Sequence, residues 1–148
     1  MKRALACLGA LTALTAGLVI TGPSAQAATS GCSTTTKYYD THGYYTDVPT
    51  VGLRGTNFCT LRRGASNDAV YALQVTLNYC YRKDTGGFDG VFGAKTETAL
   101  KQVQSSLHLT ADGVYGPNTR DALEWQWRAM SGSQVCDKLT ARGPVRDA

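Results

Sequence analysis

The stretch DGVFGAKTETAL (Asp89–Leu100) is followed by a second version of itself, DGVYGPNTRDAL (Asp112–Leu123), 23 positions further along the chain. Seven of the twelve aligned positions are identical. The leading aspartate of each copy can accept hydrogen bonds from nearby backbone N–H groups, and the second glycine suits the N-cap of a helix. The repeat therefore predicts two loop-plus-helix units. We assign eight positions to this structural motif: Asp89, Gly90, Gly93, Thr96, Asp112, Gly113, Gly116 and Thr119.

Three helices are expected around the repeat. Apolar residues on one helical face predict a first helix over about Asn67–Tyr79, with Ser66 or Asn67 as its N-cap. The second is expected over about Ala94–Leu107 and the third over about Pro117–Met130. The inward positions would be Val70, Leu73, Leu77, Ala99, Leu100, Val103, Leu107, Leu123, Trp127 and Met130. We therefore expect an all-α fold, a compact three-helix bundle built around the repeated loop-helix unit.

An N-terminal arm of different composition precedes the expected bundle. Residues 28–58 are rich in Tyr, Thr and Gly, and Tyr38–Tyr39 and Tyr44–Tyr45 flank the polar turn Asp40–Gly43. This pattern predicts a β-hairpin. The four tyrosines could stack on sugar rings, but packing against the bundle is favoured because the arm has few aliphatic side chains to bury.

The first 27 residues are typical of a secretory signal peptide. Lys2 and Arg3 precede the apolar run Ala4–Ile20, and the small residues of Ala25–Ala27 suit cleavage after Ala27. An exported chain with an even number of cysteines predicts two disulfides, and three pairings are possible. The four cysteines that remain after cleavage are Cys32, Cys59, Cys80 and Cys136.

Several classes of function are disfavoured. No CxxC pair is present and His42 and His108 are the two histidines, so we expect neither a metal site nor a cofactor. Loss of Lys2 and Arg3 lowers the formal charge from +4 to +2, which is too little to favour nucleic acid. No later segment is apolar enough to insert into a membrane. Recognisable catalytic motifs are missing, and the 31-residue arm is too short for a hydrolase fold, so we expect no enzyme.

Three segments carry a resemblance to a known family. LRRGASNDAVYALQVTLN (Leu61–Asn78), FDGVFGAKTETALKQVQ (Phe88–Gln104) and LTADGVYGPNTRDAL (Leu109–Leu123) resemble the three-helix type of peptidoglycan-binding domain, which occurs in many exported actinobacterial proteins. The double D-G-x-[FY]-G-x-x-T-x-x-A-L signature after V-x-x-L-Q-x-x-L is its most specific part. The chain departs from the family at Val103, where Phe is usual, and at His108, where Gly often ends the helix.

The resemblance implies a domain order and a function. We expect a signal peptide at 1–27, the arm at 28–58, a peptidoglycan-binding-like domain at 59–130, and a C-terminal tail at 131–148 that is tethered by Cys136. The function implied is a secreted, non-catalytic module, extracellular or attached to the cell wall. The alternative is an extracellular inhibitor or pro-segment-like regulatory partner of a secreted hydrolase.

Ligand contacts are expected from the loops that lead into the second and third helices. The candidates are Lys95, Tyr115, Asn118 and Arg120. Structural roles compete with this interpretation, because Tyr115 aligns with Phe92 as a core residue and Arg120 can pair with Glu124 within a helix. Gln74 and Gln104 are expected to form hydrogen bonds within the fold.

Overall fold

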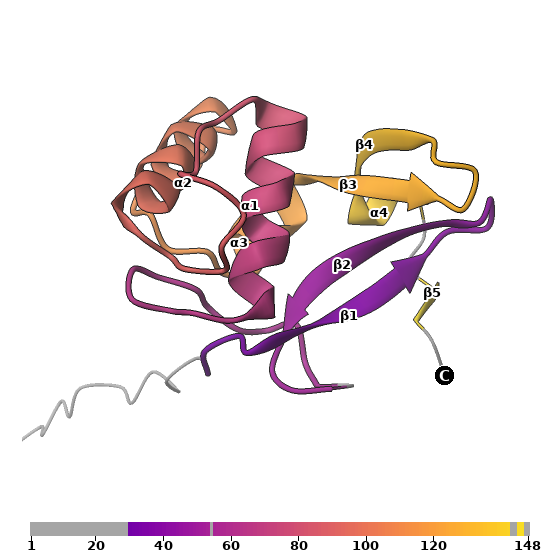
Figure 1. Cartoon of the computed structure of the whole chain (residues 1–148), viewed down its shortest axis with the longest axis horizontal. Helices are drawn as coiled ribbons and strands as arrows, with labels where there is room; N and C mark the ends of the chain where they lie inside the picture. The colour runs from indigo at the N-terminus through magenta and orange to yellow at the C-terminus, as the bar shows by residue number, and fades with distance from the viewer. Residues whose placement is uncertain (1–29, 54, 143–144, 147–148) are drawn as a thin grey trace, which may run out of the picture.

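The fold combines an antiparallel sheet with helices, and the helices of the repeat are grouped at one end of the sheet (Figure 1). The computed structural model describes residues 30–53, 55–142 and 145–146. The predicted signal peptide at 1–27 lies outside these residues. Within them, no helix combines the length and the apolar character that crossing a membrane requires. The elements are β1 (Thr34–Tyr39), β2 (Tyr44–Thr50), α1 (Asp68–Tyr81), α2 (Ala94–Ser106), α3 (Pro117–Ala122), β3 (Glu124–Ala129), β4 (Gln134–Lys138), α4 (Leu139–Arg142) and β5 (Val145–Arg146).

The prediction of an all-α three-helix bundle is wrong. The third helix begins at Pro117 as expected but ends at Ala122, and the backbone turns extended at Leu123 (φ −68°, ψ 141°). The following residues form β3, which lies between β2 and β4 in a sheet of order β4-β3-β2-β1-β5. Met130, expected to face inward, is 93% exposed.

Two tryptophans explain why this segment is a strand. Trp125 and Trp127 are fully buried on alternate positions of β3, as the two-residue period of a strand allows. Each indole N–H is satisfied by a backbone carbonyl, at 3.0 Å from Arg120 O and 3.0 Å from Asp137 O respectively. Aromatic side chains favour strands. In this fold β2 and β4 are both present as backbone partners for β3.

The first two helices follow the sequence prediction. Asn67 caps α1, with its side-chain oxygen accepting the Val70 N–H at 3.1 Å. Gly93 stands at the N-cap of α2, and α2 ends before His108, which adopts the left-handed conformation (φ 58°) that the sequence suggested for it.

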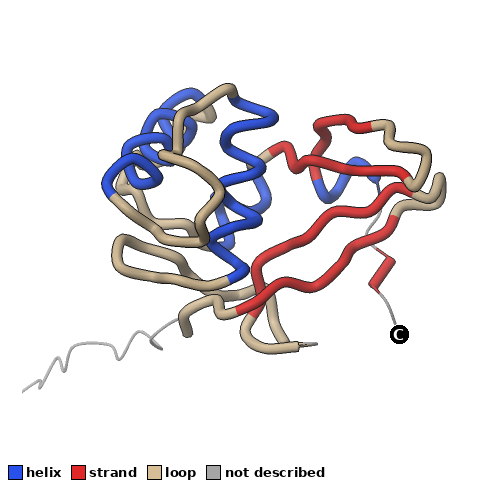
Figure 2. The backbone as a smooth tube through the Cα atoms, viewed as in Figure 1, coloured by secondary structure: helices blue, strands red, loops and turns tan. Residues whose placement is uncertain are grey.

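The hairpin predicted in the arm is formed by β1 and β2 (Figure 2). Its turn is closed by the Asp40 carboxylate, which accepts the backbone N–H groups of His42 at 2.9 Å and Tyr44 at 2.8 Å. Because side chains alternate along a strand, Tyr38 is buried in the core while Tyr39 points to the other face of the sheet. The arm therefore contributes two strands to the sheet.

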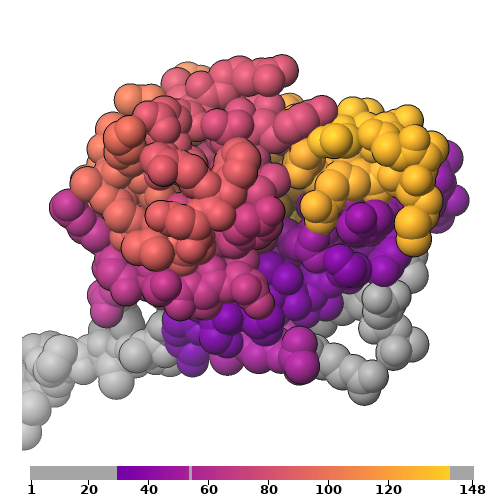
Figure 3. Space-filling model, viewed as in Figure 1, coloured from indigo at the N-terminus to yellow at the C-terminus, as the bar shows by residue number. Residues whose placement is uncertain are grey.

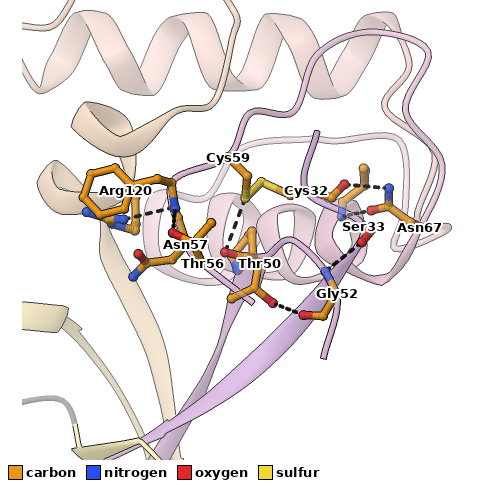
Figure 4. Close-up of a disulfide and its surroundings, with 12 residues drawn as sticks. Cys32, Ser33, Thr50, Gly52, Thr56, Asn57, Cys59, Asn67 and Arg120 are labelled. Atoms are coloured by element: carbon orange, nitrogen blue, oxygen red, sulfur yellow. Dashed lines mark hydrogen bonds between the residues drawn. A yellow bond between two sulfur atoms is a disulfide. The ribbon is translucent and has the colours of Figure 1, made fainter. Parts of the chain in front are cut away.

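Two disulfides are formed within the described residues. Cys32 precedes β1 and pairs with Cys59, which lies between β2 and α1, so this disulfide joins the two ends of the segment that contains the hairpin (Figure 4). Cys80 near the end of α1 pairs with Cys136 in β4. The structure thereby selects one of the three pairings that the sequence left open.

Candidate functional site

The first copy of the repeat is held to α1 by one buried glutamine. Gln74 donates from Nε2 to Asp89 Oδ1 at 2.9 Å and to Val91 O at 3.0 Å. Its Oε1 accepts the Gly90 N–H at 2.9 Å. The Asp89 carboxylate also accepts the Val91 N–H at 2.9 Å, which is the aspartate turn expected from the sequence.

The second copy repeats this network with Gln104 of α2. Gln104 Nε2 lies 3.0 Å from Asp112 Oδ1 and 2.9 Å from Val114 O, and Oε1 accepts the Gly113 N–H at 2.9 Å. Each glutamine also contacts the threonine in the first turn of the next helix, at 3.2 Å. The internal hydrogen bonds predicted for both glutamines are confirmed. The motif therefore fixes the position of each loop relative to the preceding helix.

This network further favours the ionised form of the aspartate of the first copy. The Gln74 amide, and after it the Val91 N–H, lower the pKa of Asp89 below its ordinary value. The carboxylate is thus an anion at neutral pH, held with one oxygen in the loop and the rest of its surface open to solvent.

Two of the four predicted ligand contacts are part of the packing. Tyr115 has no exposed surface, and its ring meets that of Trp125 edge-on at 6.2 Å. Burial raises the pKa of Tyr115 well above its ordinary value. Arg120 is 6% exposed and donates from Nη1 to Asn57 O at 3.0 Å, which joins α3 to the loop after the hairpin (Figure 4). A direct contact of either residue with a ligand would require the loops to open.

The other two predicted contacts remain accessible. Lys95 lines a hollow of about 340 Å³ at the start of α2, and its ammonium lies 3.0 Å from Asp84 Oδ2. Asn118 is exposed in the first turn of α3. Tyr115 and Arg120 are linked through Trp125, but Lys95 and Asn118 do not take part in that cluster. Ligand contact by Lys95 and Asn118 stays a prediction.

A different hollow combines aromatic and polar groups. It has a volume of about 220 Å³ and lies between the start of α1 and the loop of the first copy. Tyr71 and Phe88 form its aromatic side. They are 48% and 49% exposed, and their rings meet edge-on with centroids 6.4 Å apart. The residues that line it are Ser66, Asn67, Asp68, Tyr71, Phe88, Asp89 and Gly90.

The repeat motif places the loop against α1 and so creates this hollow. Gly90 O accepts the Asn67 N–H at 3.0 Å, so the loop is bonded directly to the cap of α1. Gly90 has φ +70°, and a Cβ there would lie 3.1 Å from Asn67 O. Only glycine fits this close approach without strain.

Tyr71 and Phe88 were missed by the sequence reasoning, which concentrated on the loops before the second and third helices. A signal was present, because Tyr71 lies off the apolar stripe of α1 that contains Val70, Leu73 and Leu77. A large aromatic side chain on the solvent side of an amphipathic helix is a candidate for ligand contact.

The hollow suits a ligand with flat apolar faces and polar substituents. Exposed rings can stack on such faces, while carboxylates accept hydrogen bonds from hydroxyl, amide or ammonium groups. Asp68 makes no ion pair within the described residues and is exposed, so its carboxylate is available. The Asn67 amide is engaged, donating to Cys32 O at 3.0 Å, and serves to hold the site together.

Comparisons with known proteins identify the helical part of the chain. Residues 66–123 match the family described as "Putative peptidoglycan binding domain", and all residues lining the hollow fall within that range. An "Uncharacterized protein in bpoA1 3'region" from Kitasatospora aureofaciens is 35% identical over 123 residues, which cover 82% of this chain and 91% of the relative.

Two further comparisons concern the helical part. The zinc D-Ala-D-Ala carboxypeptidase of Streptomyces albus G is 39% identical over 61 residues, covering 40% of this chain and 24% of that enzyme. The SleB N-terminal domain, known from a crystal structure, is 38% identical in sequence to the matched part of this chain. The match covers 43% of this chain and 85% of the SleB domain, with a TM-score of 0.40. Residues 66–123, which include both copies of the repeat, therefore form a domain that belongs to the family of peptidoglycan-binding domains.

Proposed function

We propose that this protein is a secreted, non-catalytic module that binds peptidoglycan through the hollow between Tyr71 and Phe88. The observation that carries the proposal is an exposed aromatic pair beside an available carboxylate, built entirely from residues of the family-matched region. Two disulfides support an extracellular or cell-wall location, since disulfides persist in oxidising compartments.

Peptidoglycan offers the groups that this hollow can recognise. Its sugars present flat faces for Tyr71 and Phe88, and its hydroxyl and amide groups can donate to Asp68 and Asp89. A shallow site of this size supports a dissociation constant between millimolar and tens of micromolar, about −4 to −6 kcal/mol. Many equivalent sites on a polymeric wall compensate for weak binding by rebinding.

The family match supports a binding role and assigns no reaction to this chain. The chain spans only 24% of the carboxypeptidase that it resembles, so the matched region is a small part of that enzyme. Lys95 and Asn118 are proposed as outlying contacts on the same helical part.

Sedimentation with purified, protein-free sacculi tests the proposal. The full secreted chain should sediment with sacculi, and Tyr71→Ala or Phe88→Ala should weaken binding at least tenfold because each removes half of the aromatic surface. Tyr79→Ala is the matched control, since Tyr79 is a half-exposed tyrosine on the same helix but does not line the hollow. Circular dichroism verifies that each variant is folded.

Two results would contradict the proposal. Equal binding by wild type and both hollow variants would place the site elsewhere on the protein. Failure of the wild type to sediment, combined with inhibition of a co-secreted hydrolase, would favour the regulatory alternative instead.

A further inference from the structure

A second cavity lies where α1 meets the sheet. Its volume is about 230 Å³, and Figure 3 shows the side of the molecule on which the hairpin, α1 and the C-terminal strands meet. Its lining residues on α1 are Asp68, Tyr71, Ala72, Val75 and Thr76. On the sheet they are Thr35, Thr46, Asp47, Gln126 and Arg128. All five sheet residues fall outside 66–123, so the family-matched region alone cannot form this cavity.

The sheet face beside the cavity carries an aromatic and polar surface. The strand register aligns Tyr39 with Tyr45 and Tyr45 with Arg128, which places the three side chains in one row across β1, β2 and β3. The two tyrosine rings have centroids 6.0 Å apart, and the Arg128 guanidinium lies 5.0 Å from the Tyr45 centroid. This row extends the lining of the cavity onto the open face of the sheet.

The charges around the cavity are balanced. Asp47 is paired with Lys37 at 3.0 Å and also with Arg128. Asp68 adds a second carboxylate, so two acidic groups are set against two basic groups. A surface without net charge does not attract an anion, and it suits a neutral ligand with many hydroxyl and amide groups.

Two polar groups of the cavity lining have no hydrogen-bond partner within the described residues, and of these Arg128 Nε is the buried atom. Thr76 is 2% exposed, and its hydroxyl makes no hydrogen bond within the part of the chain that the structure describes. Spacings of four residues place Asp68, Ala72 and Thr76 on the face of α1 that lines the cavity. The hydroxyl oxygen is open to the cavity, so a ligand bound there can donate a hydrogen bond to it or accept one from it.

The two hollows are neighbours. Asp68 and Tyr71 line both of them. A linear polymer that binds in the first hollow can therefore continue past Tyr71 into the second.

We propose that the sheet cavity is a second subsite, and that its ligand is the neutral glycan strand of the wall, a chain of N-acetylated amino sugars. This inference rests on the proposed function and extends it. Tyr71 and the row of Tyr39 and Tyr45 stack on sugar rings, and Gln126 and Thr76 bond to hydroxyl or acetamido groups. The appended sheet thereby lengthens the surface on which one strand is held.

A peptide-free probe tests this subsite directly. Titration of the full secreted chain with a tetramer of N-acetylglucosamine, followed by amide chemical shifts, should perturb Thr35, Asp47 and Gln126 of the sheet. Thr76→Val, which keeps the shape and removes the hydroxyl, should weaken tetramer binding about fivefold to tenfold. Val75→Trp, which fills the cavity from the helix, should weaken it more than tenfold.

The controls separate this inference from the proposed function. Thr110→Val makes the same exchange at an exposed position after α2 that lines none of the three hollows, and it should leave binding unchanged. If the protein sediments with sacculi but the tetramer perturbs no residue of the sheet, the second subsite is refuted and the wall-binding function stands. If Thr76→Val and Val75→Trp both bind like the wild type, the subsite is refuted as well. If the wild-type protein does not sediment with sacculi, both proposals are refuted.

Discussion

Replacement of Gln104 by Met is the most direct test of the motif that holds the loops. Gln104 is 1% exposed, and its amide joins α2 to the second copy of the repeat. Methionine has a similar length but offers no strong hydrogen-bonding group. The substitution therefore leaves the Gly113 N–H and the Val114 carbonyl without their partner.

The expected loss follows from those two groups. A buried backbone group that loses its partner costs about 1–3 kcal/mol. Gly113 is buried and Val114 is half-buried, so water can recover part of the second loss. We expect the free energy of unfolding to fall by about 2–4 kcal/mol, a large share of the roughly 5–15 kcal/mol of a typical domain.

Guanidinium unfolding of the disulfide-intact protein measures this change, with the fluorescence of the buried Trp125 and Trp127 as the signal. Gln102→Met is the matched control, because Gln102 is an exposed glutamine on the same helix, and it should change stability by no more than about 0.5 kcal/mol. Amide hydrogen exchange should accelerate at Gly113 in the Gln104 variant. Equal stabilities for the two variants, with Gly113 still protected, would refute the reasoning.

Two further predictions concern covalent and electrostatic support. Cys136→Ser opens the disulfide to α1, whose partners are 56 residues apart, and should lower the free energy of unfolding by about 4 kcal/mol in the chain-entropy model. Thermal unfolding with and without reductant checks this, and a variant as stable as the wild type would contradict it. Because the bond from Gln74 lowers the pKa of Asp89 in the folded state, Asp89 stabilises the fold above its unfolded pKa. That stability should be lost as the pH falls below about 4, and Asp89→Asn should reduce the slope of stability against pH in this window.

Much of the helical part could be predicted because its signals are local. The aspartate turns, the glycine at each N-cap and the proline at the start of α3 are determined by residues within a few positions of one another. The hairpin was equally local, since its turn is closed by Asp40. The candidate site was predicted less well. Tyr115 and Arg120 were chosen from their place next to a loop, and neighbours distant in sequence bury both of them.

The segment after Ala122 shows where local signals end. Leu123 and Trp127 have the spacing of a helix, while Trp125 and Trp127 have the alternation of a strand, so the pattern alone supports both. The outcome depends on β2 and β4, which provide backbone partners on both sides of β3. β2 lies more than 70 residues earlier in the chain, and its Tyr45 pairs with Arg128 of β3. β4 follows β3 after one turn.

The sequence by itself therefore determined the repeated loop-helix units, the family and the capacity for two disulfides, because these depend on residue types at short, regular spacings. Only the tertiary structure decided the sheet, the cysteine pairing and the two hollows beside Tyr71. Strand pairing and cavity shape arise from contacts between distant segments, and the free energy of those contacts is not encoded in any one local pattern.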